Sequence, residues 1–177
     1  MEKEEEAMIL DFLPNGYPLE KRMIPIAQAI GVKHFTLLEL VPRRGVSLQV
    51  KEKVYIGESK RDKIYYISGR LSREKLTEQA KMQLEDFVKN VVNEREREFV
   101  DFFNKADAIN TRVHQLELLP GFGKKHTQEI LKAREKSFES FEDIKKRIPS
   151  LPDPRKAIEK RILEELTTMQ RHNLFVK

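Results

Sequence analysis

Apolar and polar side chains alternate with a period of two near the start of the chain. Residues 47–57 show this most clearly, since their apolar side chains share one parity: Leu48, Val50, Val54 and Ile56. Successive side chains of a strand point to opposite faces, so the alternation predicts a half-buried strand. Short apolar runs at 7–13, 35–41 and 63–71, bounded by turn signals, predict three more strands.

Four or five strands in so short a stretch are too few for two packed sheets. They predict instead a small OB-like β barrel over residues 1–71. Residues 17–34 contain two prolines and the run Ile-Ala-Gln-Ala-Ile-Gly, and they fit either an irregular edge strand or a short helix.

The hydrophobic period changes to that of a helix after Ser72, which is a suitable N-cap residue. An apolar stripe at helical spacing follows, made of Leu76, Ala80, Leu84, Phe87, Val88 and Val91. Residues 93–98, which alternate Glu and Arg after an Asn, interrupt the stripe before Phe99 resumes it. The pattern predicts two helices, or one kinked helix, as a connector over residues 72–105.

A glycine-rich turn separates two helical patterns in the last third of the chain. Pro120-Gly121-Phe122-Gly123 cannot continue the helical pattern that ends at Leu119, and a new apolar stripe begins with Ile130, Leu131 and Ala133. Glycines permit positive φ and leave no Cβ in the way of an approaching group. The turn opens onto a helix N-terminus, where free N–H groups and the helix dipole favour an anion, and Lys124 and Lys125 add positive charge there.

Residues 111–135 resemble the helix-hairpin-helix family, whose members bind nucleic acid without reading its sequence. Leu119 to Gly123 match the family's hairpin, and Ile130 and Leu131 match its apolar pair. The resemblance implies that Gly121, Gly123 and Lys124 bind a backbone phosphate. Phe122, which we include in the candidate binding site, is expected to pack the turn into the core. Thr127 departs from the family, which has a small Ala there. A plain pair of helices with a glycine cap is the alternative.

A second, degenerate hairpin is predicted at residues 148–154, which repeat the outline of the first but have lost both glycines. A capping box at Ser140 opens the helix before it, and Asp153 with Pro154 opens the helix after it. Together the two hairpins predict a helical domain over residues 106–177.

Charge points to an anionic partner for this region. The formal net charge is +5, and residues 105–177 alone hold 16 Lys and Arg against 11 Asp and Glu, so 16 − 11 = 5 accounts for the whole excess. Four basic residues flank the second hairpin and are candidates for phosphate contacts: Lys145, Lys146, Arg155 and Lys156. Solvated helix faces are the alternative interpretation of each.

The barrel offers a second candidate surface. Lys51, Lys53 and Tyr55 share the polar face of one predicted strand, and Tyr65 or Tyr66 lies on the next one along the chain. Aromatic rings beside basic side chains can stack unpaired bases, although exposed rings on a barrel can also pack against helices.

Several classes of chemistry are disfavoured. The chain has no cysteine, its four histidines fall at no metal-ligand spacing, and no apolar run is long enough to span a bilayer. We therefore expect no cofactor, no metal, no membrane and a cytoplasmic location. Lys125 and Asp143 match the spacing of the catalytic pair in some DNA glycosylase/lyases, but the local context of that family is absent.

A barrel over the first 71 residues and a helical connector precede two further motifs, Leu-Glu-Leu-Leu-Pro-Gly-Phe-Gly-Lys-Lys at 116–125 and Phe-Glu-Ser-Phe-Glu-Asp-Ile at 138–144. With these features the whole chain resembles an archaeal family known only as a domain of unknown function. Resemblance and pattern together predict an α+β protein with an OB-like barrel followed by paired helix-hairpin-helix motifs. The expected function is sequence-independent binding of DNA or RNA through backbone phosphates, without catalysis. A protein–protein interaction module is the competing hypothesis.

Overall fold

The structure, a computed structural model, describes residues 3–177. Its contacts divide the chain into two compact units. The sheet unit comprises the chain up to Asp86 together with Glu165–Lys177, and the helical unit comprises Phe87–Glu164. The chain passes from one unit to the other within two of its helices.

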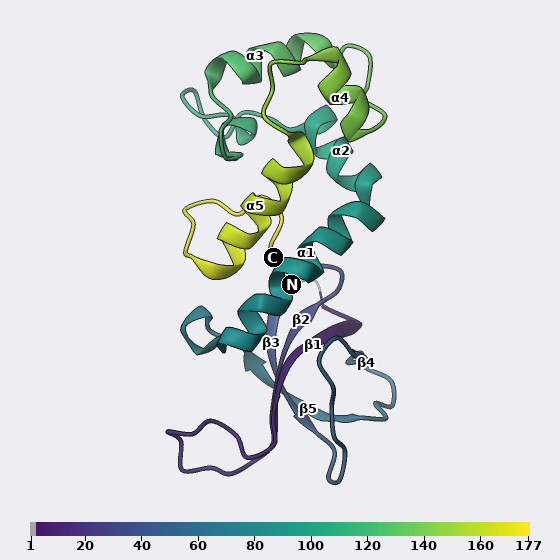
Figure 1. Cartoon of the computed structure of the whole chain (residues 1–177), viewed down its shortest axis with the longest axis vertical. Coiled ribbons are helices and arrows are strands. Elements are labelled where there is room, and N and C mark those ends of the chain that lie inside the picture. Colours follow the sequence, from purple (N-terminus) through teal and green to yellow (C-terminus); the bar gives the residue numbers. More distant parts are fainter. Residues whose placement is uncertain (1–2) are drawn as a thin grey trace. The chain divides into compact units, whose positions relative to one another are not determined.

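The described residues of the sheet unit form five antiparallel strands. In chain order they are β1 (Glu6–Leu13), β2 (Ile26–Gly31), β3 (Leu37–Pro42), β4 (Lys53–Tyr55) and β5 (Ile64–Arg70). They pair in the order β4-β1-β2-β3-β5 and curl into a half-barrel (Figure 1). The predicted α+β class is confirmed. The sheet stays open, because β4 and β5 are its two edges and do not pair with each other.

A compact apolar cluster fills the concave side of this sheet. It consists of Ala7, Ile9, Ala27, Ala29, Leu38, Leu40, Leu48, Val54, Ile56 and Ile64. The parity predicted for residues 47–57 is confirmed in Leu48, Val54 and Ile56, which are buried. The strand itself is much shorter than predicted, because the chain turns at 49–51, where Lys51 has a φ of 75°.

The segment at 17–34 contains a central strand, so the prediction of an edge strand or a short helix was wrong. β2 lies between β1 and β3 and is buried on both faces. One face presents Ala27 and Ala29 to the core; on the other, Gln28 donates to the Lys75 carbonyl at 2.6 Å and accepts from Thr77 N–H at 3.0 Å. A strand buried on both faces lacks the alternation by which strands are recognised.

Helical structure follows the sheet. In the part of the chain that the structure describes, two short 3-10 turns, η1 (Arg73–Lys75) and η2 (Gln115–Leu118), accompany five α-helices: α1 (Glu78–Glu94), α2 (Glu96–Lys105), α3 (Lys124–Ala133), α4 (Phe141–Arg147) and α5 (Pro154–Thr167). The predicted interruption is confirmed as a break at Arg95. The predicted cap was wrong. Ser72 precedes only η1, and α1 is capped by Thr77, whose hydroxyl accepts from Ala80 N–H at 3.1 Å.

Aromatic rings form the centre of the helical unit. Phe103 of α2 is fully buried, and its ring lies 6.1 Å from that of Phe122 and 6.4 Å from that of Phe141. Phe138 is also fully buried. These rings fix the turn that contains Phe122 against α2 and α4.

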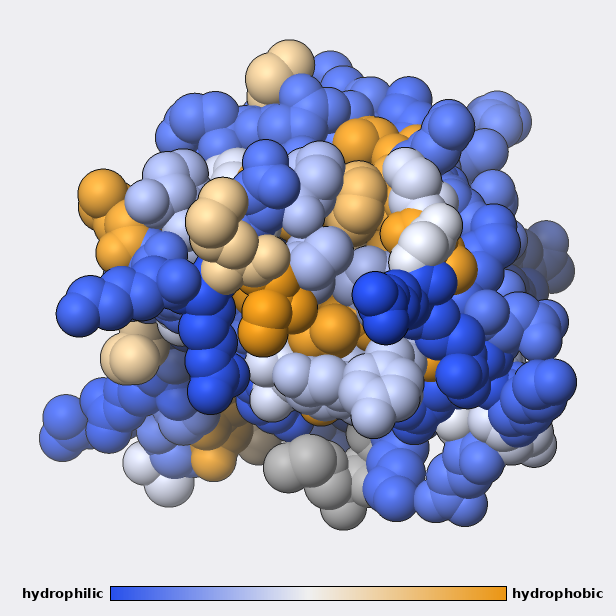
Figure 2. Space-filling view, turned by 90° about the horizontal axis from the view of Figure 1, so that it is seen from below, coloured by the Kyte–Doolittle hydropathy of each residue, from blue (hydrophilic) through white to orange (hydrophobic). Residues whose placement is uncertain are grey.

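The outer surface is mostly hydrophilic, as the charged fraction of 36% leads one to expect. Figure 2 shows one face, on which hydrophobic residues gather among hydrophilic ones. The most exposed apolar side chain that the structure describes is Leu19, in the β1–β2 connection, with a relative exposure of 100%.

Candidate nucleic-acid interface

The glycine hairpin, residues 119–124, joins η2 to α3. Gly121 has a φ of +83°, a left-handed conformation that favours glycine, whereas Gly123 has an ordinary extended backbone with φ −113° and ψ −168°. The expectation of positive φ therefore holds only for Gly121. Phe122 is buried between them, as predicted, and its N–H donates to the Leu119 carbonyl at 3.0 Å.

The start of α3 is open to solvent. Gly123 is the N-cap residue, and a Cβ built on it meets no heavy atom within 4 Å. The imidazole Nδ1 of His126 accepts from Gly123 N–H at 3.3 Å, but no acidic side chain lies in the first turn. The N–H groups of Lys124 and Lys125 have no intrahelical partner at this position. The side chain of Lys125 is exposed and has no hydrogen bond or ion pair with any residue in the described part of the chain.

Lys124 has a different role from its neighbour. Its ammonium group donates to the Arg112 carbonyl at 2.7 Å and to the Glu117 carboxylate at 3.0 Å. The backbone N–H of His114 and then Lys124 lower the pKa of Glu117. Burial, and next the charge of Arg134, lower the pKa of His114. Lys124 thus fastens the preceding loop to the start of α3, and only part of its charge is available to a ligand.

The second hairpin packs against the first. A Cβ built on Gly121 would lie 3.4 Å from Cγ of Pro152, which places the two turns in contact. The predicted cap of α5 is confirmed, since Asp153 accepts from Lys156 N–H at 3.3 Å and Pro154 begins the helix. A carboxylate therefore already occupies the start of α5, whereas the start of α3 has none.

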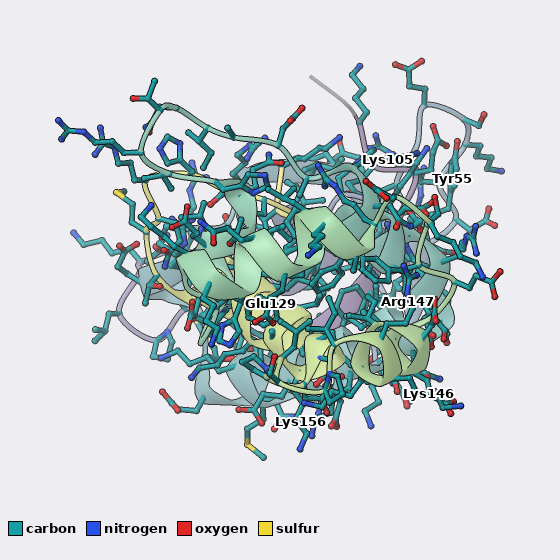
Figure 3. All side chains as sticks on the ribbon, turned by 90° about the horizontal axis from the view of Figure 1, so that it is seen from above. Tyr55, Lys105, Glu129, Lys146, Arg147 and Lys156 are labelled. Atoms are coloured by element: carbon teal, nitrogen blue, oxygen red, sulfur yellow. The ribbon has the colours of Figure 1, made fainter. Side chains whose placement is uncertain are left out.

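The basic residues around the second hairpin differ in availability. Lys145 donates to the Leu151 carbonyl, and Arg155 binds Glu96 at 2.8 Å and Asn93 at 3.1 Å, so both have structural partners. Lys146 forms only an exposed pair with Glu142 at 3.4 Å, and Lys156 has no side-chain partner among the described residues. In Figure 3 these two lysines lie at the periphery.

Sequence reasoning did not assign a structural role to Arg147. Its guanidinium donates to the carbonyls of Ala133 and Lys136 and binds Asp143 at 3.4 Å, so it joins the end of α3 to α4 (Figure 3). The carboxylate of Asp143 also accepts from Glu139 N–H at 3.0 Å. Asp143, the carboxylate that the lyase alternative would use, is therefore already bound to Arg147 and to the backbone of Glu139.

The candidate residues on the barrel are dispersed. Lys51 lies in a turn, with its ammonium 3.9 Å from the Asp86 carboxylate, and Lys53 is exposed on β4. The hydroxyl of Tyr55 accepts from Ser59 N–H at 3.0 Å. Tyr55 lies on β4 and Tyr65 on β5. These strands form opposite edges of the sheet, so the two tyrosines are not on neighbouring, hydrogen-bonded strands.

No cluster of acidic and histidine side chains suited to a metal ion occurs within residues 3–177. In the same part of the chain, no helix has the length and apolar character needed to cross a membrane.

Comparisons with known proteins identify relatives over almost the whole chain. An uncharacterised protein of Methanocaldococcus jannaschii, MJ0038, is 43% identical over 177 residues, which cover 98% of this chain and 80% of the relative. The crystal structure of Af1531 from Archaeoglobus fulgidus is also 43% identical, covers 98% of this chain and 100% of its own, and superposes with a TM-score of 0.83. The model of a family described as protein of unknown function, DUF655, matches residues 3–177. The chain therefore belongs to the DUF655 family, which has archaeal members.

Proposed function

We propose that this protein binds DNA or RNA independently of sequence, with the glycine hairpin acting as a helix-hairpin-helix phosphate site. The observation that carries the proposal is the open start of α3. Gly123 supplies no side-chain cap, and no acid lies in the first turn. By contrast, Thr77, Ser140 and Asp153 cap α1, α4 and α5, and α2 has two acids in its first turn.

A phosphate at this position would meet groups suited to it. The N–H groups of Lys124 and Lys125 point out of the helix end, the helix dipole favours negative charge, and the ammonium of Lys125 has no competing partner among the described residues. None of these groups reads a base edge, so the contact would be the same for any sequence. Lys146 and Lys156 would add contacts that weaken as salt rises.

Binding titrations of duplex DNA, single-stranded DNA and structured RNA at two salt concentrations test this proposal. We expect at least one of them to bind at low salt and to weaken steeply at high salt. The absence of binding to all three at low salt would refute it.

A matched pair of variants localises the site. Lys125→Gln and Lys132→Gln each remove one exposed charge from α3, at its first and last turn respectively. If the phosphate lies at the start of α3, only Lys125→Gln should weaken binding appreciably. Equal losses in the two variants would indicate a diffuse effect of net charge. Incubation with an abasic-site duplex and borohydride tests the absence of catalysis, because a lyase would be trapped covalently at Lys125.

A further inference from the structure

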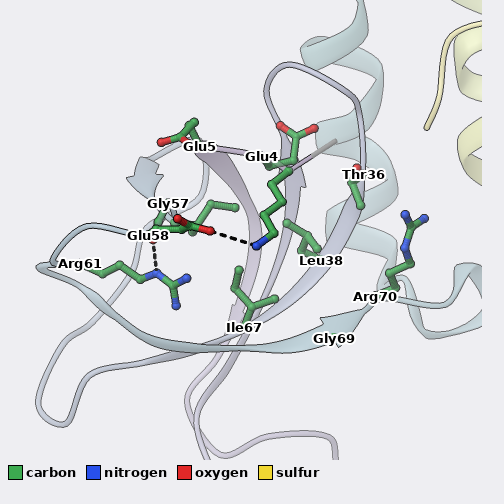
Figure 4. A pocket seen from close by; sticks show the side chains of 12 residues that line it. Glu4, Glu5, Thr36, Leu38, Gly57, Glu58, Arg61, Ile67, Gly69 and Arg70 are labelled. Atoms are coloured by element: carbon green, nitrogen blue, oxygen red, sulfur yellow. Dashed lines mark hydrogen bonds and ion pairs between the residues drawn. The ribbon is translucent and has the colours of Figure 1, made fainter. Parts of the chain in front are cut away.

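The open edge of the half-barrel contains a cavity of about 530 Å³ (Figure 4). Its lining comes from residues 3–5, from β3 and β5, and from the segment after β4. This volume lies within the range of about 300–1,000 Å³ that is typical of small-molecule sites. The cavity lies entirely within the sheet unit and is separate from the glycine hairpin.

One side of the cavity is apolar. Leu38, Ile56 and Ile67 line it, and the first two are buried members of the sheet's core. Gly69 also lines it, with a φ of +154° and no heavy atom within 4 Å of the position that its Cβ would occupy. An apolar group could therefore lie against the three aliphatic side chains without a steric obstacle at Gly69.

Arg61 supplies a cation at the same cavity. Its Nε donates to the Gly57 carbonyl at 2.8 Å, which fixes the guanidinium over the segment that follows β4. The residue is half-buried, and its two terminal nitrogens have no partner among residues 3–177. Figure 4 shows the group reaching into the cavity. A partly desolvated guanidinium with free donors is suited to a carboxylate or phosphate.

Within residues 3–177, none of the carboxylates that line the cavity forms an ion pair with Arg61. Glu58 pairs with Lys3 at 3.0 Å, and both side chains are largely exposed. Glu4 accepts hydrogen bonds from the backbone N–H groups of residues 33–34 at 3.1 and 2.6 Å. Glu5 is exposed and forms no ion pair with Arg61. The terminal nitrogens of Arg61 are therefore not engaged by any carboxylate among residues 3–177.

We propose that this cavity binds a small amphipathic anion, that is, a carboxylate or phosphate attached to an apolar body. The terminal nitrogens of Arg61 would hold the anion, and Leu38, Ile56 and Ile67 would hold the apolar part. This site is additional to the proposed nucleic-acid function and does not depend on it.

Four eight-carbon probes test the proposal on the full chain: octanoate, octyl phosphate, octylammonium and octanol. Binding is followed through the amide NMR shifts of Gly57, Ile67 and Gly69. We expect the two anions to bind at least about tenfold more tightly than octylammonium, because an ammonium group cannot accept the hydrogen bonds that Arg61 donates to an anion. The tighter of the two anions identifies the headgroup.

Arg61→Gln separates a specific site from general apolar binding. It should weaken octanoate about tenfold or more while leaving octanol unchanged. Arg44→Gln is the matched control, because Arg44 is exposed in the β3–β4 connection, outside the cavity. Equal binding of octanoate and octylammonium, no effect of Arg61→Gln, or no shifts with any anion at millimolar concentration would each overturn the proposal.

Discussion

Replacing Gly123 with Asp should strengthen the fold and weaken nucleic-acid binding at the same time. The backbone at this position has φ −113° and ψ −168°, which any residue adopts, and a Cβ there meets open space. An Asp N-cap accepts a hydrogen bond from the first turn of the helix, and its charge interacts favourably with the helix dipole.

The size of both effects can be estimated. Asp in place of a Gly cap contributes a few tenths of a kcal/mol, and the charge at the helix start about 0.3–1 kcal/mol more. For a chain of this length, about 1 kcal/mol raises Tm by roughly 2–4 °C. A carboxylate about 4 Å from a phosphate would repel it by roughly 1 kcal/mol in water and about 4 kcal/mol near a protein surface, so we expect at least about a fivefold loss of affinity.

Thermal unfolding and a nucleic-acid titration, made on the same preparation, measure the two effects. Gly123→Asn is the matched control, because it provides a similar cap without the charge and should lose much less affinity. An Asp variant with raised Tm and unchanged affinity would refute the placement of phosphate at the start of α3.

Three further predictions concern stability. Gly121→Ala should lower the free energy of unfolding, measured in denaturant, by about 1–2 kcal/mol, because an Ala at φ +83° is strained. Gly123→Ala is the control and should lose less, because the backbone at Gly123 is extended. Phe103→Ala should lower that free energy by about 3–5 kcal/mol in the same assay, and a loss below 1 kcal/mol would contradict its central place in the core. The folded state lowers the pKa of Glu117, so the unfolded chain binds more protons below pH 4.5 and the free energy of unfolding should fall as the pH drops through the lowered pKa. In urea titrations at pH 6 and pH 3.5, Glu117→Gln should make this fall smaller. An identical fall in the variant would exclude a contribution of Glu117 to the acid sensitivity.

The sequence was most informative where one side of an element is buried. Alternation at 47–57 and the helical stripe after residue 76 predict faces that the structure confirms, since Leu48, Val54, Leu84 and Val88 are buried. Helix caps could also be predicted from neighbouring residues, as the N-cap at Asp153 shows. Such signals depend only on residues a few positions apart.

Other features depend on partners far away in the chain. β2 was misread because both of its faces are covered, one of them by contacts between Gln28 and residues 75–77. Leu131, predicted to lie in an apolar stripe, is 36% exposed. The hydrogen bond from His114 N–H to Glu117 could have been suspected from the spacing of these two residues, which resembles a capping box. The bonds of Lys124 to Glu117 and to the Arg112 carbonyl could not, because no local pattern marks them.

The contact between Gly121 and Pro152 has a consequence for how the helical unit opens. The two turns are far apart in the chain, yet the Pro152 ring packs at Gly121, so an outward movement of either turn would break this contact. Local opening of α3 should therefore be coupled to that of the start of α5, and the slowest-exchanging amides of both helices should share one opening free energy in native-state hydrogen exchange. The turn without glycines would then help to decide how often the turn that has them opens.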